Sequence, residues 1–258
     1  MRRELAFLGE LDTEDQVLVS KVAEWTELST QKYINKFTMF LNEHQRALCE
    51  KVFSALCFEI FRFFGGYEGA SRTLCGIFAP YEEPSDDAFP IQAVSFSYRS
   101  SDRLTHRDFL GCIMSLGISR ETVGDIIVGD GFAVVFVTGV AAELVLSLEK
   151  VGRTGVKASL GFDKALLPQQ EYSSIEAYVS SLRFDCVVSA AVKLSREKAA
   201  LLIRRGLCEL NYMSSVSPDK KLEEGDVFSV RGYGKFFLSS IGEPTRKDRL
   251  RIVIMKYL

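Results

Sequence analysis

Lysine and arginine side chains gather in one short segment, where they could contact the phosphates of a nucleic acid. Residues 196–205 are predicted to form a basic helix that begins after Ser195, a typical N-cap residue, and ends at Gly206. Lys198 and Arg205 are seven residues apart, so their side chains share one stripe of that helix. By charge alone, this stripe is equally typical of a helix face that only meets water.

A second predicted helix precedes the basic one, and its apolar face should hold the two helices together. Phe184, Val187, Val188 and Ala191 recur at helical spacing. Structured RNA is recognised mainly by its shape, its phosphates and its 2′-hydroxyls, and a rigid helix pair that presents cations suits that task. We expect Asp185 to orient the arginines or to cap a helix rather than to meet phosphate.

Charge is distributed unevenly along the 258 residues. The net charge of the chain is −2, yet 15 of its 32 Lys and Arg and only 9 of its 34 Asp and Glu lie from Ser181 onward. Residues 1–180 therefore hold 17 basic and 25 acidic residues. Such segregation is expected when one module meets a polyanion and the remainder does not. RNA binding should reside mainly in residues 181–258.

The composition excludes several other classes of protein. The six cysteines form no CxxC pair and no zinc spacing with the two histidines, so we expect free buried thiols in a reducing cytosol, no metal and no cofactor. The N-terminal residues lack the apolar core of a signal peptide, and the longest apolar stretch, 132–142, is too short to span a bilayer. A cytoplasmic protein without a membrane partner is predicted.

Three parts follow one another along the sequence, and together they predict an α+β protein. Residues 1–88 should hold helices, with capping-box starts at Thr13 and Asn42, and a β-hairpin. Residues 89–165 alternate strand and helix patterns in the order βαββαβ, the ferredoxin-like arrangement that RNA-recognition domains also use. Residues 180–258 contain the helix pair and end in alternating strands.

The middle part makes the most specific structural prediction. Residues 91–99 and 132–138 should be strands of one sheet, and helices at 105–116 and 140–150 should lie on one of its faces. This topology hosts many functions, so it does not establish RNA binding by itself. Four aromatic residues there are expected to pack in the core or the sheet rather than to stack on bases: Phe96, Tyr98, Phe132 and Phe136.

A series of separated residue types runs through the basic region. In order, it comprises Arg183, Asp185, Leu194-Ser195-Arg196, Ala199, Ile203, Gly206, Leu210-Asn211, Pro218 and Gly225-Asp226. The series resembles the RNA-binding domain named after small-subunit ribosomal protein S-four. Tyr212 stands where that family usually has glycine, and Cys208 stands where it usually has valine. The resemblance implies an RNA face lined by Arg183, Ser195, Arg196, Lys198, Arg204 and Arg205 and flanked by Asn211, Lys220 and Lys221.

Arg196 carries the sharpest expectation within this region. It follows the predicted cap Ser195, where its guanidinium could contact a phosphate with two hydrogen bonds. Arg196→Ala should then weaken RNA binding and leave folding intact. The alternative is that Arg196 pairs with Asp185 or another acid and holds the two helices together, in which case the variant would melt at a lower temperature.

Further segments extend the resemblance to nearly the whole chain. They are FTMFLNEHQ (37–45), FFGGYEGASR (63–72), LTHRDFLGCIMSLGISRETVGDIIVG (104–129) and LEKVGRTGV (148–156). Together with the C-terminal part they resemble the bacterial YlmH family of RNA-binding proteins. The resemblance implies a region with an RNA-recognition-like domain, then an S-four domain with a tail of strands at 234–241 and 249–257. We expect Arg231, Lys235, Arg249 and Arg251 to extend the basic surface, and His106, Arg107, Arg120 and Arg153 to be possible secondary RNA contacts.

No familiar catalytic motif occurs in the sequence. A glycine-rich cofactor loop after a strand, a P-loop, a zinc-protease motif, a nucleophile elbow and the Gly-Arg-Leu-Asp of pseudouridine synthases are all missing. We therefore predict a non-catalytic protein that binds structured ribosomal RNA, tRNA or both. The family resemblance further implies large ribosomal subunits with stalled peptidyl-tRNA as partners, in ribosome-associated quality control. The alternative is an RNA-modifying enzyme or its targeting subunit, of the pseudouridine synthase or methyltransferase class.

Overall fold

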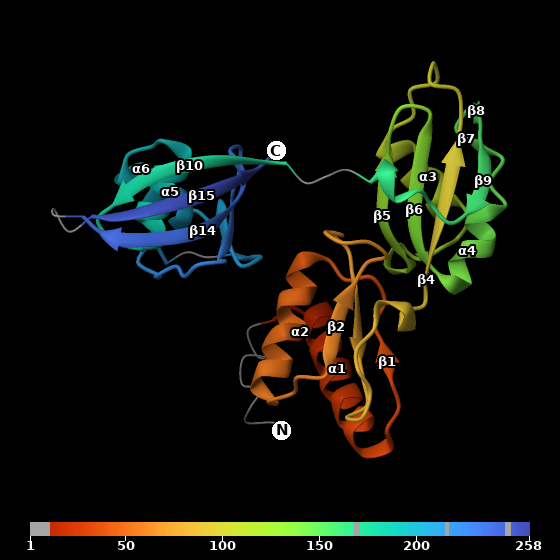
Figure 1. Ribbon diagram of the computed structural model, residues 1–258, viewed down its shortest axis with the longest axis horizontal. Coiled ribbons are helices and arrows are strands. Elements are labelled where there is room, and N and C mark those ends of the chain that lie inside the picture. The colour runs from red at the N-terminus through yellow and green to blue at the C-terminus, as the bar shows by residue number, and fades with distance from the viewer. Residues whose placement is uncertain (1–10, 168–170, 215–216, 246–248) are drawn as a thin grey trace. The chain divides into compact units, whose positions relative to one another are not determined.

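The chain divides into two compact units, one ending at Pro168 and the other starting at Gln169. In this computed structural model each unit packs helices against antiparallel sheets (Figure 1), so the predicted α+β class is confirmed. Among the described residues, no helix combines the length and the apolar character needed to cross a membrane. The structure describes residues 11–167, 171–214, 217–245 and 249–258, so the first ten residues of the predicted N-terminal part lie outside it.

The first layer of unit 1 consists of two helices and a small sheet. Asp12 caps the first helix, because its Oδ1 accepts from the amide of Asp15 at 2.9 Å, so the prediction of a cap at Thr13 was wrong by one residue. The predicted capping box of Asn42 and Gln45 is confirmed. The three strands lie in the order β1-β3-β2. The elements are α1 Thr13–Lys32, β1 Lys36–Phe37, α2 Glu43–Ala55, β2 Phe61–Phe64 and β3 Leu74–Ile77.

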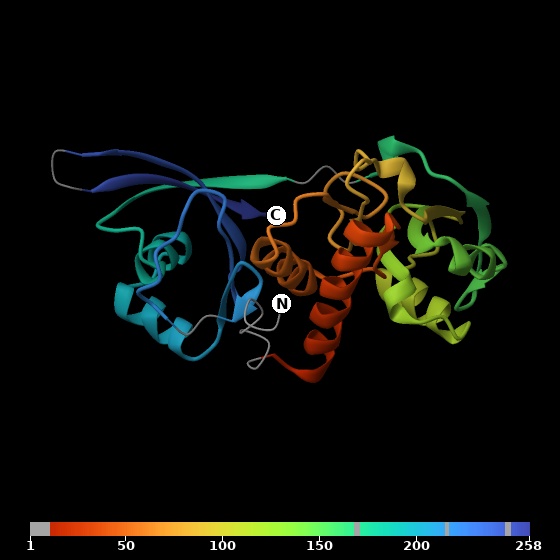
Figure 2. The same ribbon diagram turned by 90° about the horizontal axis from the view of Figure 1, so that it is seen from below.

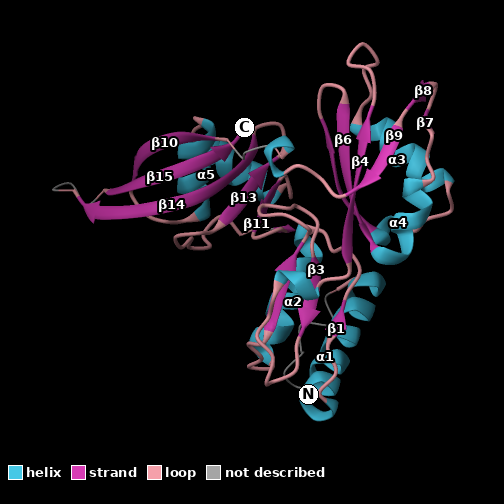
Figure 3. Cartoon of the chain, turned by 45° about the vertical axis from the view of Figure 1, so that its right-hand side comes forward, coloured by secondary structure: helices cyan, strands magenta, loops and turns pink. Residues whose placement is uncertain are grey.

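The second layer of unit 1 is a four-stranded antiparallel sheet in the order β5-β6-β4-β9. Strands β6, β4 and β9 of this sheet are labelled in Figure 3. β4 pairs with β6 along its whole length, as predicted for 91–99 and 132–138. Two helices, α3 and α4, pack on one face of this sheet in a shared core that includes Phe109 and Ala142. The elements are β4 Ile91–Ser97, α3 His106–Ser115, β5 Val123–Val128, β6 Phe132–Thr138, α4 Gly139–Leu146, β7 Lys150–Val151, β8 Thr154–Gly155 and β9 Lys157–Leu160, with 3₁₀ turns at Asp86–Ala88, Arg120–Thr122 and Lys164–Leu166.

The opposite face of this sheet is covered as well. Val134 and Phe136 of β6 share a core cluster with Phe40, Leu74 and Phe78 of the first layer. Strand β6 is therefore buried on both faces from its second residue to its last, whereas antiparallel sheets commonly leave one face in water. The two layers of unit 1 form one body around this strand.

One predicted element of unit 1 is shorter than expected. The helix predicted to run to residue 150 ends at Leu146, because Lys150–Val151 pairs with Thr154–Gly155 in a small hairpin. Gly152, with φ of +60°, makes the turn of that hairpin. The apolar run in the sequence does not distinguish the end of a helix from the start of a short strand.

Unit 2 is a six-stranded antiparallel sheet in the order β10-β15-β14-β13-β11-β12, with two helices on one face (Figure 2). The helices α5 and α6 share a core with inward residues such as Phe228, Phe236 and Ile254. β10 pairs with β15 along its whole length, so the sheet begins before residue 180. The elements are β10 Tyr172–Val179, α5 Phe184–Val192, α6 Arg196–Arg204, β11 Cys208–Leu210, β12 Met213–Ser214, β13 Val227–Val230, β14 Gly234–Pro244 and β15 Leu250–Tyr257.

Candidate nucleic-acid interface

A buried carboxylate holds two arginines at the start of the two helices of unit 2. Asp185, in the first turn of α5, is only 4% exposed. Its Oδ1 accepts from Nε of Arg183 at 3.2 Å, and its Oδ2 accepts from Nε of Arg196 at 2.8 Å. The arginine side chains remain 37% and 52% exposed. We call these three residues the Asp185 cluster; it presents two oriented guanidinium groups to solvent.

The electrostatics of the Asp185 cluster favour its charged form. Burial alone would raise the pKa of Asp185, but hydrogen bonds from Arg183 and Arg196 outweigh it and hold the pKa below its usual value. The same carboxylate raises the pKa of Arg196. Arg196 thus pairs with Asp185, as the alternative interpretation had it, and this pairing favours a loss of stability in Arg196→Ala. The guanidinium retains Nη donors that do not bond Asp185.

Other candidate residues lie beside this cluster. The amide of Phe184 donates to the carbonyl of Lys220 at 2.8 Å, and Arg183 forms a β-bridge with Lys221, so both lysines flank the start of α5. Arg249 lines a pocket of about 370 Å³ together with Arg196. The structure therefore brings together cations from three separate parts of the sequence.

Helix α6 carries the remaining predicted cations. Ser195 caps it, accepting from the amide of Lys198, which confirms the predicted start of the helix. Gly206 follows it with φ of +67°, which confirms the left-handed end. Arg231 lies next to this end because its amide donates to the carbonyl of Leu207 at 2.9 Å. We use the name helix surface for the Asp185 cluster together with the exposed cations Lys198, Arg204, Arg205, Lys220, Lys221, Arg231 and Arg249.

Three predicted contacts do not belong to the helix surface. Asn211 has a structural role: its Nδ2 donates to Asp226 at 2.7 Å and its Oδ1 accepts from the amide of Val227 at 3.0 Å. Lys235 lies on the outer face of the sheet, because its neighbour Phe236 points into the core beneath the helices. Arg251 is on the same outer face, paired with Glu176 at 2.7 Å.

The four candidates in unit 1 are divided between two places. His106 and Arg107 are exposed in the first turn of α3, and Arg107 lines a pocket with Gly152, next to Arg153. Arg120 follows the other end of α3, about 15 Å along the helix axis by its ten residues. Its Nη1 donates to the carbonyl of Val123. The four possible secondary contacts are therefore not gathered in one place.

The aromatic residues of the middle part are packing residues, as predicted. Phe96 and Phe136 are 1% and 0% exposed. Tyr67, from the loop between β2 and β3, stacks on Phe136 with ring centroids 4.9 Å apart. Tyr67 is fixed by a hydrogen bond from its hydroxyl to Asp125 at 2.9 Å. Base stacking on this face of the sheet, as in RNA-recognition domains, is blocked by the first layer.

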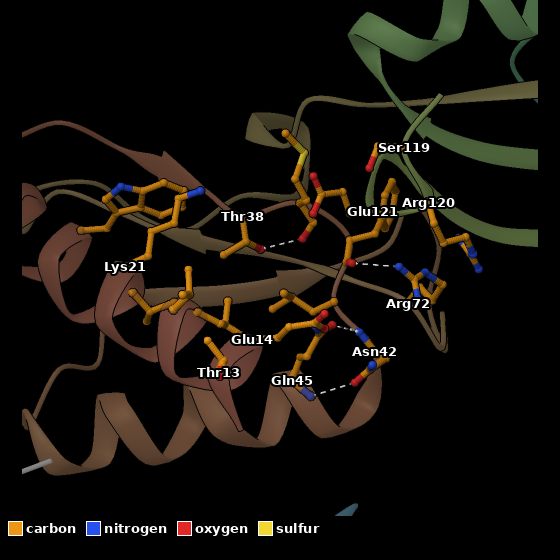
Figure 4. Close-up of a pocket in the computed structure, with 17 residues that line it drawn as sticks. Thr13, Glu14, Lys21, Thr38, Asn42, Gln45, Arg72, Ser119, Arg120 and Glu121 are labelled. Carbon is orange, nitrogen blue, oxygen red and sulfur yellow. Dashed lines mark hydrogen bonds between the residues drawn. The ribbon is translucent and has the colours of Figure 1, made fainter. Parts of the chain in front are cut away.

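A groove of about 640 Å³ lies in unit 1 (Figure 4). Lys21 lies over the ring of Trp25 at 4.7 Å on one side, and Arg72 and Arg120 lie on the other. Arg72 donates to the carbonyls of Phe40 and Val123 at 2.9 and 3.1 Å, so it joins the two layers. Within the described part of the chain, no group of three or more His, Cys, Asp or Glu is placed to hold a metal ion.

Comparisons with known proteins agree with each other. Residues 84–160 match the family model described as "Putative RNA-binding domain in YlmH". The chain is 28% identical over 244 residues to ribosome-associated protein quality control protein P2 of Bacillus subtilis (strain 168), covering 93% of this chain and 94% of that one. A solved structure, the cell division protein ylmH from Streptococcus pneumoniae, superposes with a TM-score of 0.50 and 25% identity, covering 58% of this chain and 93% of that one.

Proposed function

Because the chain belongs to the YlmH family, we propose that it is a non-catalytic protein that binds structured ribosomal RNA, tRNA or both. We assign 1–88 to an N-terminal layer, 89–165 to a ferredoxin-like domain and 180–258 to an S-four domain with a tail of strands. The element order βαββαβ around β4 to β9 supports the second assignment. The helix pair, with an arginine at the start of each helix, supports the third.

The observation that carries this proposal is the Asp185 cluster. Burying a carboxylate is costly, and here its two partners are arginines that stay half exposed. Guanidinium groups fixed in this way lose little conformational entropy when they meet a phosphate, since the carboxylate already holds them. Duplex RNA presents phosphates at regular spacing, and Lys198, Arg204 and Arg205 extend away from the cluster along α6.

We further propose that the RNA is that of large ribosomal subunits carrying stalled peptidyl-tRNA. The relative from Bacillus subtilis is named as a ribosome-associated quality control protein, and the two chains match over almost their full lengths. On such a particle the helix surface would meet ribosomal RNA or the tRNA.

The test uses two exposed cations of α6 that are not part of the Asp185 cluster. The double variant Lys198→Ala with Arg205→Ala should bind large subunits more weakly, and the dependence of its affinity on salt should fall by about 0.7–0.9 in logarithmic slope for each lost phosphate contact. The matched control, Lys157→Ala with Lys164→Ala, removes two exposed lysines of unit 1 and should keep the slope of the unchanged protein. Co-sedimentation at several salt concentrations measures both.

Two results would overturn the proposal. Unchanged affinity and slope in the α6 variant would show that the helix surface does not meet RNA. Equal binding to vacant large subunits and to subunits that carry peptidyl-tRNA would remove the stalled complex as the preferred target.

A further inference from the structure

The outer face of the unit 2 sheet carries a group of aromatic side chains, on the side away from the helices. Tyr172, Phe237 and Tyr257 come from β10, β14 and β15, which are neighbours in the sheet. Their ring centroids lie 5.2 to 5.8 Å apart, and all three pairs meet edge to face. Tyr172 is 42% exposed, and the other two are partly exposed. Phe237 points outward because it lies between the core residues Phe236 and Leu238. Tyr172 and Tyr257 are paired opposite each other, and each lies three residues from an inward isoleucine, Ile175 or Ile254, so alternation places them on the outer face as well.

A cation lies within the same group. The Nζ of Lys235 is 4.9 Å from the ring centre of Tyr257 and 4.7 Å from that of Tyr212. Lys235 thus connects Tyr212 to the three rings across the sheet. We call these five residues the aromatic strip: Tyr172, Tyr212, Lys235, Phe237 and Tyr257.

Tyr212 occupies a backbone position that suits glycine better. Asn211 and Tyr212 form the two-residue turn between β11 and β12, with φ of +50° and +62°. A turn of this kind favours Asn-Gly, because a side chain at positive φ is strained. Such strain persists where the surroundings enforce it, and it often marks a functional position. Here the strained conformation is the one that places the tyrosine ring over Lys235.

We propose that the aromatic strip binds single-stranded RNA by stacking unpaired bases on its rings, with Lys235 beside the phosphates that link them. Proteins that bind unpaired strands combine aromatic stacking platforms with nearby cations, often on a sheet surface. A partner protein with an apolar surface would be expected to meet a face without a charge at its centre, whereas Lys235 sits between two rings. The excess of basic residues in this unit also favours a polyanion.

This inference rests on the proposed function, since the strip would hold a single-stranded extension of the structured RNA that the helix surface binds. The helix surface and the aromatic strip lie on opposite faces of one sheet. Unit 2 could therefore bind an RNA duplex on one face of its sheet and the unpaired end of the same RNA on the other.

The experiment compares two RNA probes with the full chain: a blunt hairpin, and the same hairpin with a short single-stranded 3′ extension. The unchanged protein should bind the extended probe at least about fivefold more tightly for each stacked base. Phe237→Leu and Tyr257→Leu keep apolar surface but remove the rings, so they should lose this gain and bind the blunt hairpin as before. Tyr233→Leu, at an exposed tyrosine outside the strip, is the matched control and should keep it.

Tyr212→Gly separates a binding role from a structural one. Glycine relaxes the turn, so the melting temperature should not fall, while the gain from the extension should shrink. The inference is overturned if the extension gives no gain in the unchanged protein, or if the ring variants keep the gain. If the blunt hairpin is not bound at all, the proposed function fails. The aromatic strip is then tested by measuring how the same variants bind the single-stranded extension alone. Equal binding of that single strand by all variants would also refute the inference about the strip.

Discussion

Replacing Asp185 by asparagine should reveal how much the Asp185 cluster contributes to the stability of unit 2. Asparagine keeps the shape and one acceptor oxygen but removes the charge between two arginines. Breaking a fully buried ion pair costs about 3–5 kcal/mol, and a hydrogen bond to a charged group contributes about 1.5–3 kcal/mol. The side chains of Arg183 and Arg196 reach water, so we expect a loss below that of a fully buried pair, about 1–3 kcal/mol.

Hydrogen exchange of the α5 and α6 amides measures this loss locally, which matters because the two units need not unfold together. The matched control is Glu176→Gln, which removes a carboxylate that pairs with Arg251 on the outer face of the same sheet. Both members of that pair are more than half exposed, so the control should change stability little. Equal losses in the two variants would refute the idea that the buried carboxylate organises the helix pair.

The difference in stability between the unchanged protein and Asp185→Asn should depend on pH in a definite direction. The pKa of Asp185 is lowered in the folded state, so its contribution to stability is fully present above the unfolded pKa of about 3.9. That contribution is lost as the pH falls through the folded pKa. The difference in stability between the unchanged protein and Asp185→Asn should therefore be constant near neutral pH and narrow below about pH 4. A difference that grows toward acid pH would contradict the assignment.

Two further predictions concern unit 1. Gly66→Ala should destabilise the protein by about 1–3 kcal/mol, because the added Cβ would lie 2.3 Å from the ring of Phe136. Gly69→Ala, which is also at positive φ but has open space around it, should destabilise the protein less. Thermal unfolding of both variants measures the difference, and equal losses of stability would contradict the close packing at Gly66. In a maleimide labelling experiment read by mass spectrometry, exposed Cys57 should react long before Cys49, since burial raises the pKa of the Cys49 thiol to about 12; early labelling of Cys49 would show that its surroundings open readily.

Features that depend on short stretches of sequence could be predicted well. The capping box at Asn42, the strand 132–138 and the helix ends at Ser195 and Gly206 all follow from residues within a few positions of each other. At the helix ends the decisive interaction is a local hydrogen bond or a local backbone conformation. The same reasoning placed the cations of α6 on one exposed helix.

Features that depend on residues far apart in the sequence could not be predicted. Strand β10 was missed because its partner β15 lies more than seventy residues later, and no periodicity records that pairing. The bond between Arg196 and Asp185 joins two helices, so the sequence only raised it as an alternative. Lys235 is a separate case: its charge suggested that it extends the basic surface, and the alternation of β14 places it on the outer face of the sheet.

The double burial of β6 has a consequence for how unit 1 can be divided. A fragment cut at 84–160, the limits of the family match, would keep α3 and α4 but lose Phe40, Leu74 and Phe78, which cover the other face of the sheet. Val134 and Phe136 would then face water, and a continuous apolar sheet surface of this kind promotes aggregation. Residues 84–160 should thus be incomplete as an independent folding unit of this chain, because the N-terminal layer covers the second face of their sheet.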